Sequence, residues 1–309
     1  MSLHRVNSVT VGVPDPIGTA KFYEDFGLTR REMSFATVDG GEQLHLVRRD
    51  RRELVAAEFG CDDADDVART QRQLATLDLV ADESSPVAVA AYEPATGVRV
   101  RVAVTPRTLQ PVTQAPQYNG PGRIERVGAR SAVLQRPEQV RPRRLGHFVL
   151  GTPDFDASYA FFVAGLGMRV SDRIRDVGAF LRCSDDHHNL LIQRAPVPFL
   201  HHTSWQVDDV DEIGRGATAM LAADPDRHVW GLGRHYAGSN FFWYLKDPSG
   251  NFAEYHSDMD CIVDDALWTP EDLEGARGLY SWGPPPPASF LHPDDLAELM
   301  IAGHSRSSR

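Results

Sequence analysis

The sequence predicts an α+β fold of four βαβββ modules, paired into two domains that each carry an open, mixed, barrel-like sheet with helices on its outer side. Segments 7–28 and 146–168 share one pattern: an alternating apolar strand, a Pro-Asp turn, and an amphipathic helix that ends at a glycine. Two further pairs of segments repeat at an offset of 146 residues: 40–49 with 186–195, and 54–74 with 200–220. A supersecondary unit repeated in this way indicates two copies of one domain.

The order of these elements sets the expected boundaries. Residues 1–104 form an N-terminal domain of two modules, and residues 143–258 form a C-terminal domain of two more. Residues 105–142 are rich in Pro, Gln and Gly and weakly periodic, as is typical of a linker. Residues 259–309 are expected to form a C-terminal helical extension and tail, with helices near 270–277 and 293–303.

Composition excludes several classes of protein. With 42% hydrophobic and 24% charged residues, the chain is neither disordered nor membranous, and no apolar run reaches the length of a bilayer span. A net charge of -11 argues against a nucleic-acid partner. The N-terminus lacks the pattern of a signal peptide, and the three cysteines fit neither a disulfide framework nor a CxxC site. A cytoplasmic protein is therefore expected.

Histidine is the informative residue type, since eight of the twelve lie between His147 and His256. The internal repeat distinguishes candidate functional residues from residues that the fold requires, because the fold does not require residues that only one copy contains. The alignment of the two halves pairs His147 with Ser8, His202 with Ala56, and Glu254 with Arg101. Two histidines and a carboxylate therefore lie on parallel strand positions of the second half, where their N-terminal counterparts cannot bind a metal.

Two histidines and one carboxylate leave three coordination positions of a metal open. This set suits Fe(II) chemistry with dioxygen and, less often, Mn(II). Zinc can use the same ligands, so the ligand types alone leave the metal open. One carboxylate leaves a formal charge of +1 on the centre, which favours an anionic bidentate ligand such as a catecholate.

The stretch 233–254 resembles the signature of the type I extradiol ring-cleavage dioxygenases, a branch of the vicinal oxygen chelate superfamily. The residues that carry the resemblance are Gly233, His235, Tyr244, Asp247, Pro248, Gly250 and Glu254. The resemblance is closest over 143–258 and extends over about 4–258. It implies that His147, His202 and Glu254 hold the metal. His202 is preferred to His201 because strand alternation is expected to turn His201 to the opposite face.

The resemblance also implies roles around the metal. His188 resembles the acid-base histidine of the family, while His235 and Tyr244 correspond to groups that hydrogen-bond the substrate oxygens. Phe180 and Val149 are expected to line the substrate pocket. His187 and His256 are expected to be structural. Ala237 departs from the family, in which many members have a polar residue two positions after the histidine.

The implied activity is that of an iron-dependent extradiol dioxygenase, with Mn(II) as a possible replacement for Fe(II). It would cleave a catechol-type ring next to the diol, insert both atoms of O2 and release a yellow ring-opened product, in the breakdown of aromatic compounds. A homo-oligomer is also implied.

Two alternatives remain open: a glyoxalase-like lyase or isomerase, and a protein that only binds a small aromatic ligand. Measurements of bound metal and of oxygen uptake distinguish the dioxygenase from these two alternatives.

Overall fold

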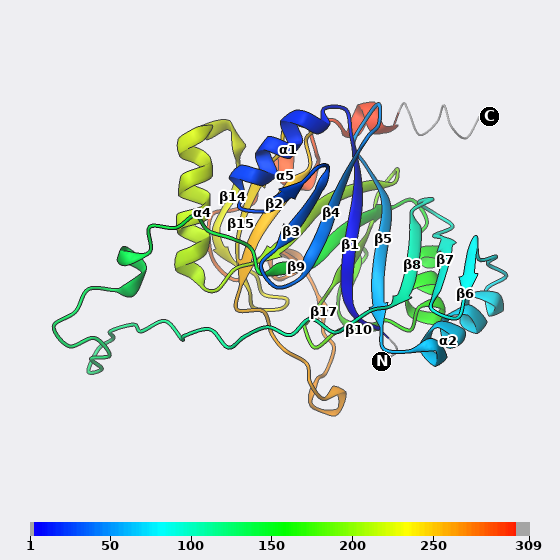
Figure 1. The fold of residues 1–309 in the computed structure, drawn as a ribbon, viewed down its shortest axis with the longest axis horizontal. Helices are drawn as coiled ribbons and strands as arrows, with labels where there is room; N and C mark the ends of the chain where they lie inside the picture. Colours follow the sequence, from blue (N-terminus) through cyan, green and yellow to red (C-terminus); the bar gives the residue numbers. More distant parts are fainter. Residues whose placement is uncertain (1–2, 301–309) are drawn as a thin grey trace.

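The computed structural model describes residues 3–300 and contains two mixed β-sheets lying side by side (Figure 1). The first sheet has eight strands in the order β2-β3-β4-β1-β5-β8-β7-β6. The second has nine strands in the order β14-β15-β16-β13-β9-β12-β11-β10-β17. Apart from β17, the second sheet has the strand order of the first sheet in reverse, with every strand number higher by eight. The two halves therefore repeat one topology.

Each module consists of a strand, a helix and three further strands. In the first half these are β1 (Leu3–Val13), α1 (Pro16–Asp25), β2 (Thr29–Arg31), β3 (Ser34–Thr37), β4 (Gly41–Arg48), β5 (Glu53–Cys61), α2 (Ala64–Thr76), β6 (Glu83–Ser85), β7 (Ala88–Tyr92) and β8 (Arg99–Val104). In the second half they are β9 (Arg144–Thr152), α3 (Phe155–Tyr159) with a π-helical continuation over Ala160–Gly165, β10 (Arg169–Ile174), β11 (Gly178–Arg182), β12 (Leu190–Arg194), β13 (Phe199–Gln206), α4 (Val210–Ala223), β14 (His228–Arg234), β15 (Phe241–Lys246) and β16 (Phe252–Ser257).

Pairing defines the modules. The first strand of each module pairs in parallel with its last strand, as β1 does with β4 and β9 does with β12. The first strands of neighbouring modules pair antiparallel, as β9 does with β13. The sheets do not close into barrels. The predicted fold of four βαβββ modules with open, mixed sheets is therefore confirmed.

The module helices begin in the same way in all four copies. An aspartate precedes each helix and accepts a hydrogen bond from a backbone N–H of the first turn: Asp15, Asp63, Asp154 and Asp209. Such N-caps each contribute about 1 kcal/mol to helix stability. Over residues 3–300, no helix is both long enough and apolar enough to cross a bilayer.

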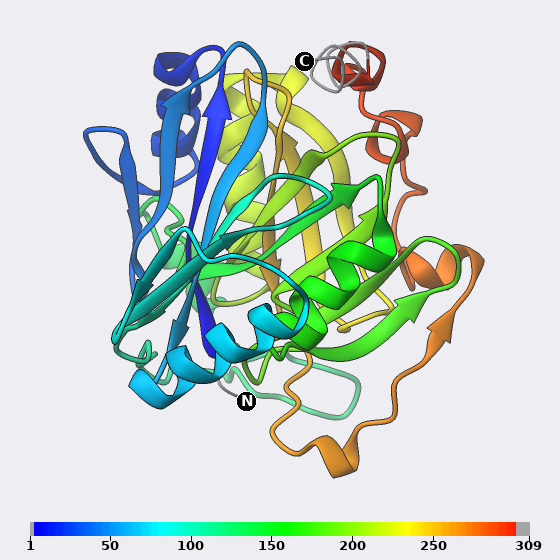
Figure 2. The same ribbon diagram turned by 90° about the vertical axis from the view of Figure 1, so that its right-hand side faces the viewer.

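The two halves share one hydrophobic core. Tyr255 on β16 stacks on Phe26 of the first half with 3.8 Å between ring centroids, and its hydroxyl donates to the Phe26 carbonyl over 2.7 Å. On the other side, Leu74 of α2 and Leu77 directly after it pack against Gly165, and Figure 2 shows α2 (cyan) beside the helix of the third module (green). The boundaries at residues 104 and 143 stay a prediction, because this core joins the halves.

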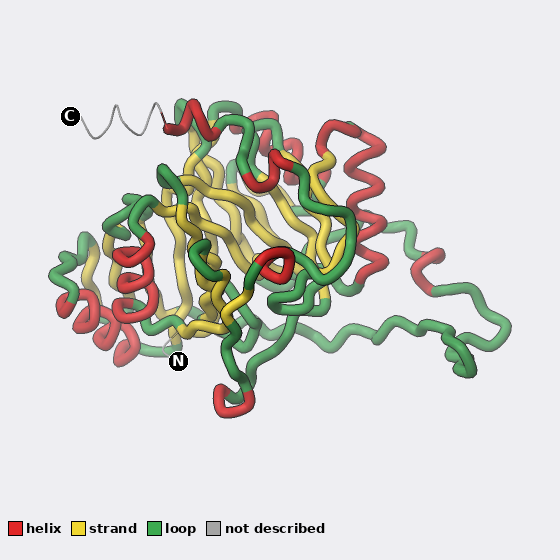
Figure 3. The backbone as a smooth tube through the Cα atoms, turned by 180° about the vertical axis from the view of Figure 1, so that it is seen from behind, coloured by secondary structure: helices red, strands yellow, loops and turns green. Residues whose placement is uncertain are grey.

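Residues 105–143 leave the body of the molecule as a long excursion with a single 3-10 turn over Ala132–Gln135 (Figures 1 and 3). They lie where the linker was predicted.

The C-terminal segment differs from the prediction of a helical extension over 259–309. Instead of a helix near 270–277, it contains the strand β17 (Asp272–Leu273), which pairs with β10, and a 3-10 turn over Gly275–Gly278. Pairing with the free edge of the sheet outweighed the local helical pattern. The short helix α5 (Ala288–Leu291) follows, and residues 296–300 are helical. The end of the helix predicted over 293–303 lies outside the described residues.

Candidate metal centre and its pocket

Three neighbouring strands in the middle of the second sheet bring the predicted ligands together. Ser204 on β13 is in register with His147 on β9 on one side and with Glu254 on β16 on the other. His202 lies two residues before Ser204 on the same strand. One ligand atom from each of His147, His202 and Glu254 lies within 4.8 Å of the others, and all three residues are buried.

The donor atoms point at one another. Glu254 Oε2 lies 3.2 Å from His147 Nε2 and 3.6 Å from His202 Nε2, and the two Nε2 atoms are 3.4 Å apart. Glu254 Oε2 is fully buried and accepts no hydrogen bond within residues 3–300. A buried carboxylate oxygen without a donor is costly, and a cation among these three atoms would satisfy it.

The protonation states of these side chains also favour a bound cation. Burial lowers the pKa of His202 well below its usual value, so this imidazole is neutral and offers a lone pair. Burial alone would raise the pKa of the Glu254 carboxyl, but the imidazoles of His147, His235 and His202 around it lower that pKa well below its usual range. A carboxylate with neutral imidazoles is the donor set that a divalent transition metal takes.

His201 does not turn away from the site as expected. A β-bulge shifts the register between Leu200 and His202, so strand alternation is interrupted at His201. His201 Nδ1 lies 2.8 Å from His202 Nδ1, and its Nε2 donates to the Phe290 carbonyl over 2.7 Å. The prediction for this side chain was wrong because alternation carries no signal for a bulge.

His188 lies on one side of the triad. Its ring centroid is 4.2 Å from that of His147 and 4.9 Å from that of Phe180. Burial, together with the charges of His147 and His187, lowers the pKa of His188 well below its usual value. His188 Nδ1 lies 3.0 Å from His187 Nδ1, and His187 Nε2 lies 2.9 Å from a carboxylate oxygen of Asp172. These bonds fix the His188 ring, and no hydrogen bond to its Nε2 is made within residues 3–300.

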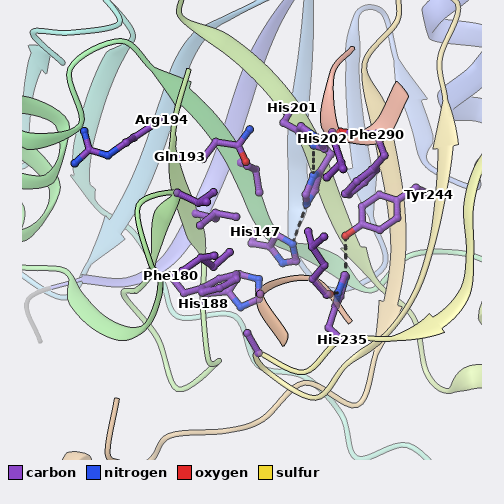
Figure 4. Close-up of a pocket in the computed structure, with 18 of the residues that line it drawn as sticks. His147, Phe180, His188, Gln193, Arg194, His201, His202, His235, Tyr244 and Phe290 are labelled. Atoms are coloured by element: carbon purple, nitrogen blue, oxygen red, sulfur yellow. Dashed lines mark hydrogen bonds between the residues drawn. The ribbon is translucent and has the colours of Figure 1, made fainter. Parts of the chain in front are cut away.

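His235 and Tyr244 lie on the opposite side of the triad (Figure 4). The Tyr244 hydroxyl is 2.9 Å from His235 Nε2, and His235 Nδ1 bonds the Leu279 carbonyl. His235 Nε2 is also 3.7 Å from Glu254 Oε1, which accepts from Asn240 over 3.3 Å. Burial and the charge of Glu254 raise the pKa of Tyr244 well above its usual value, so the phenol keeps its proton.

A cavity of about 370 Å³ opens above the triad. His188 lines it on one side, and His235 and Tyr244 line it on the other. Val149 and Phe180 form part of its wall, together with Leu191 and Ala237 in one apolar cluster. The C-terminal segment closes another side with Leu279 and Phe290. Gln193 and Arg194 lie farther from the histidines in Figure 4. An apolar slot lined at one end by His147 and His202, with Glu254 buried next to them, fits a flat aromatic molecule with adjacent polar atoms.

His256 is buried beside the triad without belonging to it. Its Nδ1 lies 2.7 Å from Ser204 Oγ, and burial lowers its pKa to about 3. Its ring fills the space above Gly146, where a Cβ atom would lie 2.4 Å from the ring. A structural role stays our prediction for this residue.

The site contains four residues that sequence reasoning did not assign. His201 fixes the ring of His202 and the Leu279 carbonyl fixes that of His235, while Asp172 and the Phe290 carbonyl act one step farther out, on His187 and His201. The paired histidines 187–188 and 201–202 were the only signal in the sequence that pointed to any of them.

Known proteins match both the second half of this chain and nearly its whole length. The Glyoxalase/Bleomycin resistance protein/Dioxygenase superfamily matches residues 144–255. Metapyrocatechase 2 of Cupriavidus necator is 34% identical over 303 residues, which cover 94% of this chain and 92% of that protein. An iron-dependent extradiol dioxygenase of Rhodococcus jostii is 30% identical over 137 residues, which cover 40% of this chain and 45% of that protein.

Solved structures share the fold. A Mn(II)-bound glyoxalase from Novosphingobium aromaticivorans aligns over 93% of this chain and 95% of its own, with a TM-score of 0.72 and 23% identity. Homoprotocatechuate 2,3-dioxygenase from Brevibacterium fuscum aligns over 94% of this chain and 92% of its own, with a TM-score of 0.73 and 19% identity. At these identities the likeness establishes the fold alone.

Four βαβββ modules around a site of two histidines and a carboxylate define the vicinal oxygen chelate class of metalloprotein. Given the identity to a metapyrocatechase over nearly the whole length, the chain belongs to the type I extradiol ring-cleavage dioxygenases of that superfamily.

Proposed function

We propose that this chain uses a divalent metal, Fe(II) in preference to Mn(II), to cleave a catechol-type ring next to the diol with both atoms of O2. The observation that carries the proposal is the convergence of His147, His202 and Glu254 beside an apolar cavity that the two histidines line. Its support is the single carboxylate of the set, which leaves a net positive charge for an anionic catecholate, and the three coordination positions left open.

His147, His202 and Glu254 would hold the metal, which would supply Lewis acidity and one-electron redox chemistry. The protein holds the ring and moves protons. Val149 and Phe180 provide apolar surfaces for the ring. On one side of the triad, Tyr244 keeps its phenol proton and donates it to His235 Nε2. The Tyr244 oxygen can accept from a substrate hydroxyl while its own proton is held by His235, and a phenol O–H turned from His235 toward the substrate would stabilise the ionised oxygen.

His188 acts on the other side. Since it is neutral, its free Nε2 can take a proton from the substrate and return it to the oxygen that leaves during O–O cleavage. Because His188 lies apart from the Tyr244–His235 pair, the two proposed proton-handling roles fall on different sides of the ring.

We place the protein in the cytoplasm, since Cys61, Cys183 and Cys261 are all free thiols. The partners we propose are the catechol and O2, with a homo-oligomer as the assembly. The net charge of -11 disfavours a nucleic-acid partner.

The test is anaerobic purification, metal analysis and a substrate panel. Catechol and its alkyl- and aryl-substituted derivatives should consume oxygen and give yellow ring-opened products. A glutathione hemithioacetal in the same panel tests the lyase alternative. Stoichiometric metal with turnover of the hemithioacetal alone would contradict the proposal, and so would binding of catechols without oxygen uptake.

A further inference from the structure

The carbonyl of Phe290, in the C-terminal segment, reaches a histidine next to a metal-binding residue. Its oxygen lies 2.7 Å from His201 Nε2, and both residues are buried. A carbonyl oxygen can only accept a hydrogen bond, so His201 must carry its proton on Nε2. The Nδ1 atom of a neutral His201 is then an acceptor.

That acceptor faces the Nδ1 atom of His202 across 2.8 Å. Two ring nitrogens at this distance need one donor and one acceptor, so His202 must carry its proton on Nδ1. The Nε2 atom of His202 is left with a free lone pair, and this is the atom that lies 3.6 Å from Glu254 Oε2.

The opposite arrangement would block the site. If His201 carried its proton on Nδ1, His202 would have to accept there and would present an N–H from Nε2 toward Glu254. The Phe290 carbonyl excludes this state, because His201 Nε2 would then meet it lone pair to lone pair. His147 has no comparable support: within residues 3–300, its Nδ1 atom is buried and lacks a hydrogen-bond partner.

We propose that His201, anchored on the Phe290 carbonyl, is a positioning residue that holds His202 in the tautomer able to bind the metal. The proposal rests on the proposed metal-binding role of His202.

The anchor is itself held in place. The Phe290 ring packs with its centroid 4.7 Å from those of Trp230 and Tyr244, so the residue that supplies the carbonyl is fixed in the wall of the cavity. The same segment supplies the Leu279 carbonyl to His235 Nδ1, which leaves His235 Nε2 to accept from Tyr244. Two backbone carbonyls of the C-terminal segment thus set the tautomers of histidines on two sides of the site.

Two variants separate this role from packing. His201→Phe keeps the ring volume among aromatic neighbours but removes both nitrogens. His201→Asn loses volume but can keep an oxygen that accepts from His202 Nδ1. His45→Phe, in the first sheet, is the matched control. Mn(II) affinity is measured on the metal-free full chain by the electron paramagnetic resonance signal of free Mn(II), and thermal melting checks the fold.

We expect His201→Phe to weaken Mn(II) binding about 10- to 100-fold, His201→Asn to weaken it less, and the control to leave it unchanged. If His201 served packing alone, His201→Asn would weaken Mn(II) binding more than His201→Phe. That result would overturn the proposal. Nitrogen-15 NMR of the metal-free protein reads the tautomer directly, with His202 assigned by substitution. A proton on Nδ1 supports the proposal and a proton on Nε2 refutes it, whether or not the chain cleaves catechols.

Discussion

Arg101 and Glu58 form an ion pair at 2.6 Å in the first sheet, at positions that match Glu254 and Ser204 of the second. The register establishes the match, because Ser8, Glu58 and Arg101 lie across three neighbouring strands just as His147, Ser204 and Glu254 do. Glu83 also bonds Arg101. The first copy of the fold thus fills the position of the metal centre with paired charges, and the chemistry is confined to the second.

This match supplies a paired prediction. Glu254→Gln removes the only carboxylate of the triad and should weaken metal binding by more than about 100-fold, beyond the usual effect of outer residues. Arg101→Gln, at the equivalent position, should leave metal content unchanged and alter the free energy of unfolding by about 1 kcal/mol or less, because the pair is partly exposed. Metal analysis and urea unfolding of both variants check this. Equal metal loss in both would contradict the assignment of the site.

His188→Gln tests the acid-base role. Since a neutral amide cannot exchange a proton at this position, kcat should fall by about 10²- to 10⁴-fold. Metal content should stay at the level of the unaltered protein, because His188 is not part of the triad. Steady-state oxygen uptake with catechol measures the first quantity. A variant with nearly full kcat would remove His188 from the mechanism.

Val149→Leu tests the cavity. Val149 is buried in the wall, in one cluster with Phe180 and Leu191, and an added methylene must project into the space for the ring. Overpacking of this kind costs about 1–3 kcal/mol. We expect KM for an aryl-substituted catechol to rise about 10-fold and KM for catechol, the smaller molecule, to rise clearly less. An equal rise in KM for both substrates would mean that the aryl substituent does not lie beside Val149.

The buried histidines predict how stability depends on pH. Burial lowers the pKa of His256 to about 3 in the folded chain from an ordinary value of 6.5. Below pH 6.5 His256 therefore binds a proton in the unfolded chain but not in the folded chain. The free energy of unfolding falls as the pH drops from 6.5 toward 3. From pH 7 to pH 5 this one histidine should cost about 2 kcal/mol.

Urea unfolding of the metal-free protein at the two pH values measures the loss, and His256→Gln should reduce it by about that amount. An unchanged pH dependence in the variant would mean that His256 is protonated in the fold.

Much of the fold and the triad could be predicted because both leave local or repeated patterns. Hydrophobic alternation and the Pro-Asp helix starts recur in both halves, and each aspartate does cap its helix, as Asp15 and Asp154 show. The repeat then isolates His147, His202 and Glu254 as residues that the scaffold does not require.

What the sequence did not predict depends on contacts between distant segments. The bulge that brings His201 beside His202 lies within the continuous, almost fully buried strand β13. Phe290 and Leu279 act through backbone carbonyls, which any residue possesses. The segment 270–277 has a helical pattern, yet the free edge of β10 was available and two of its residues pair there as β17. Such contacts come from tertiary structure rather than from local propensity.

The decisive experiment on metal-dependent ring cleavage is titration of the metal-free protein with Fe(II) under anaerobic conditions, followed by oxygen uptake with catechol. We predict activity that rises with added iron and saturates at one iron per chain, with one O2 consumed for each catechol cleaved. Full activity without metal, or no activity at any ratio of iron to protein, would contradict it.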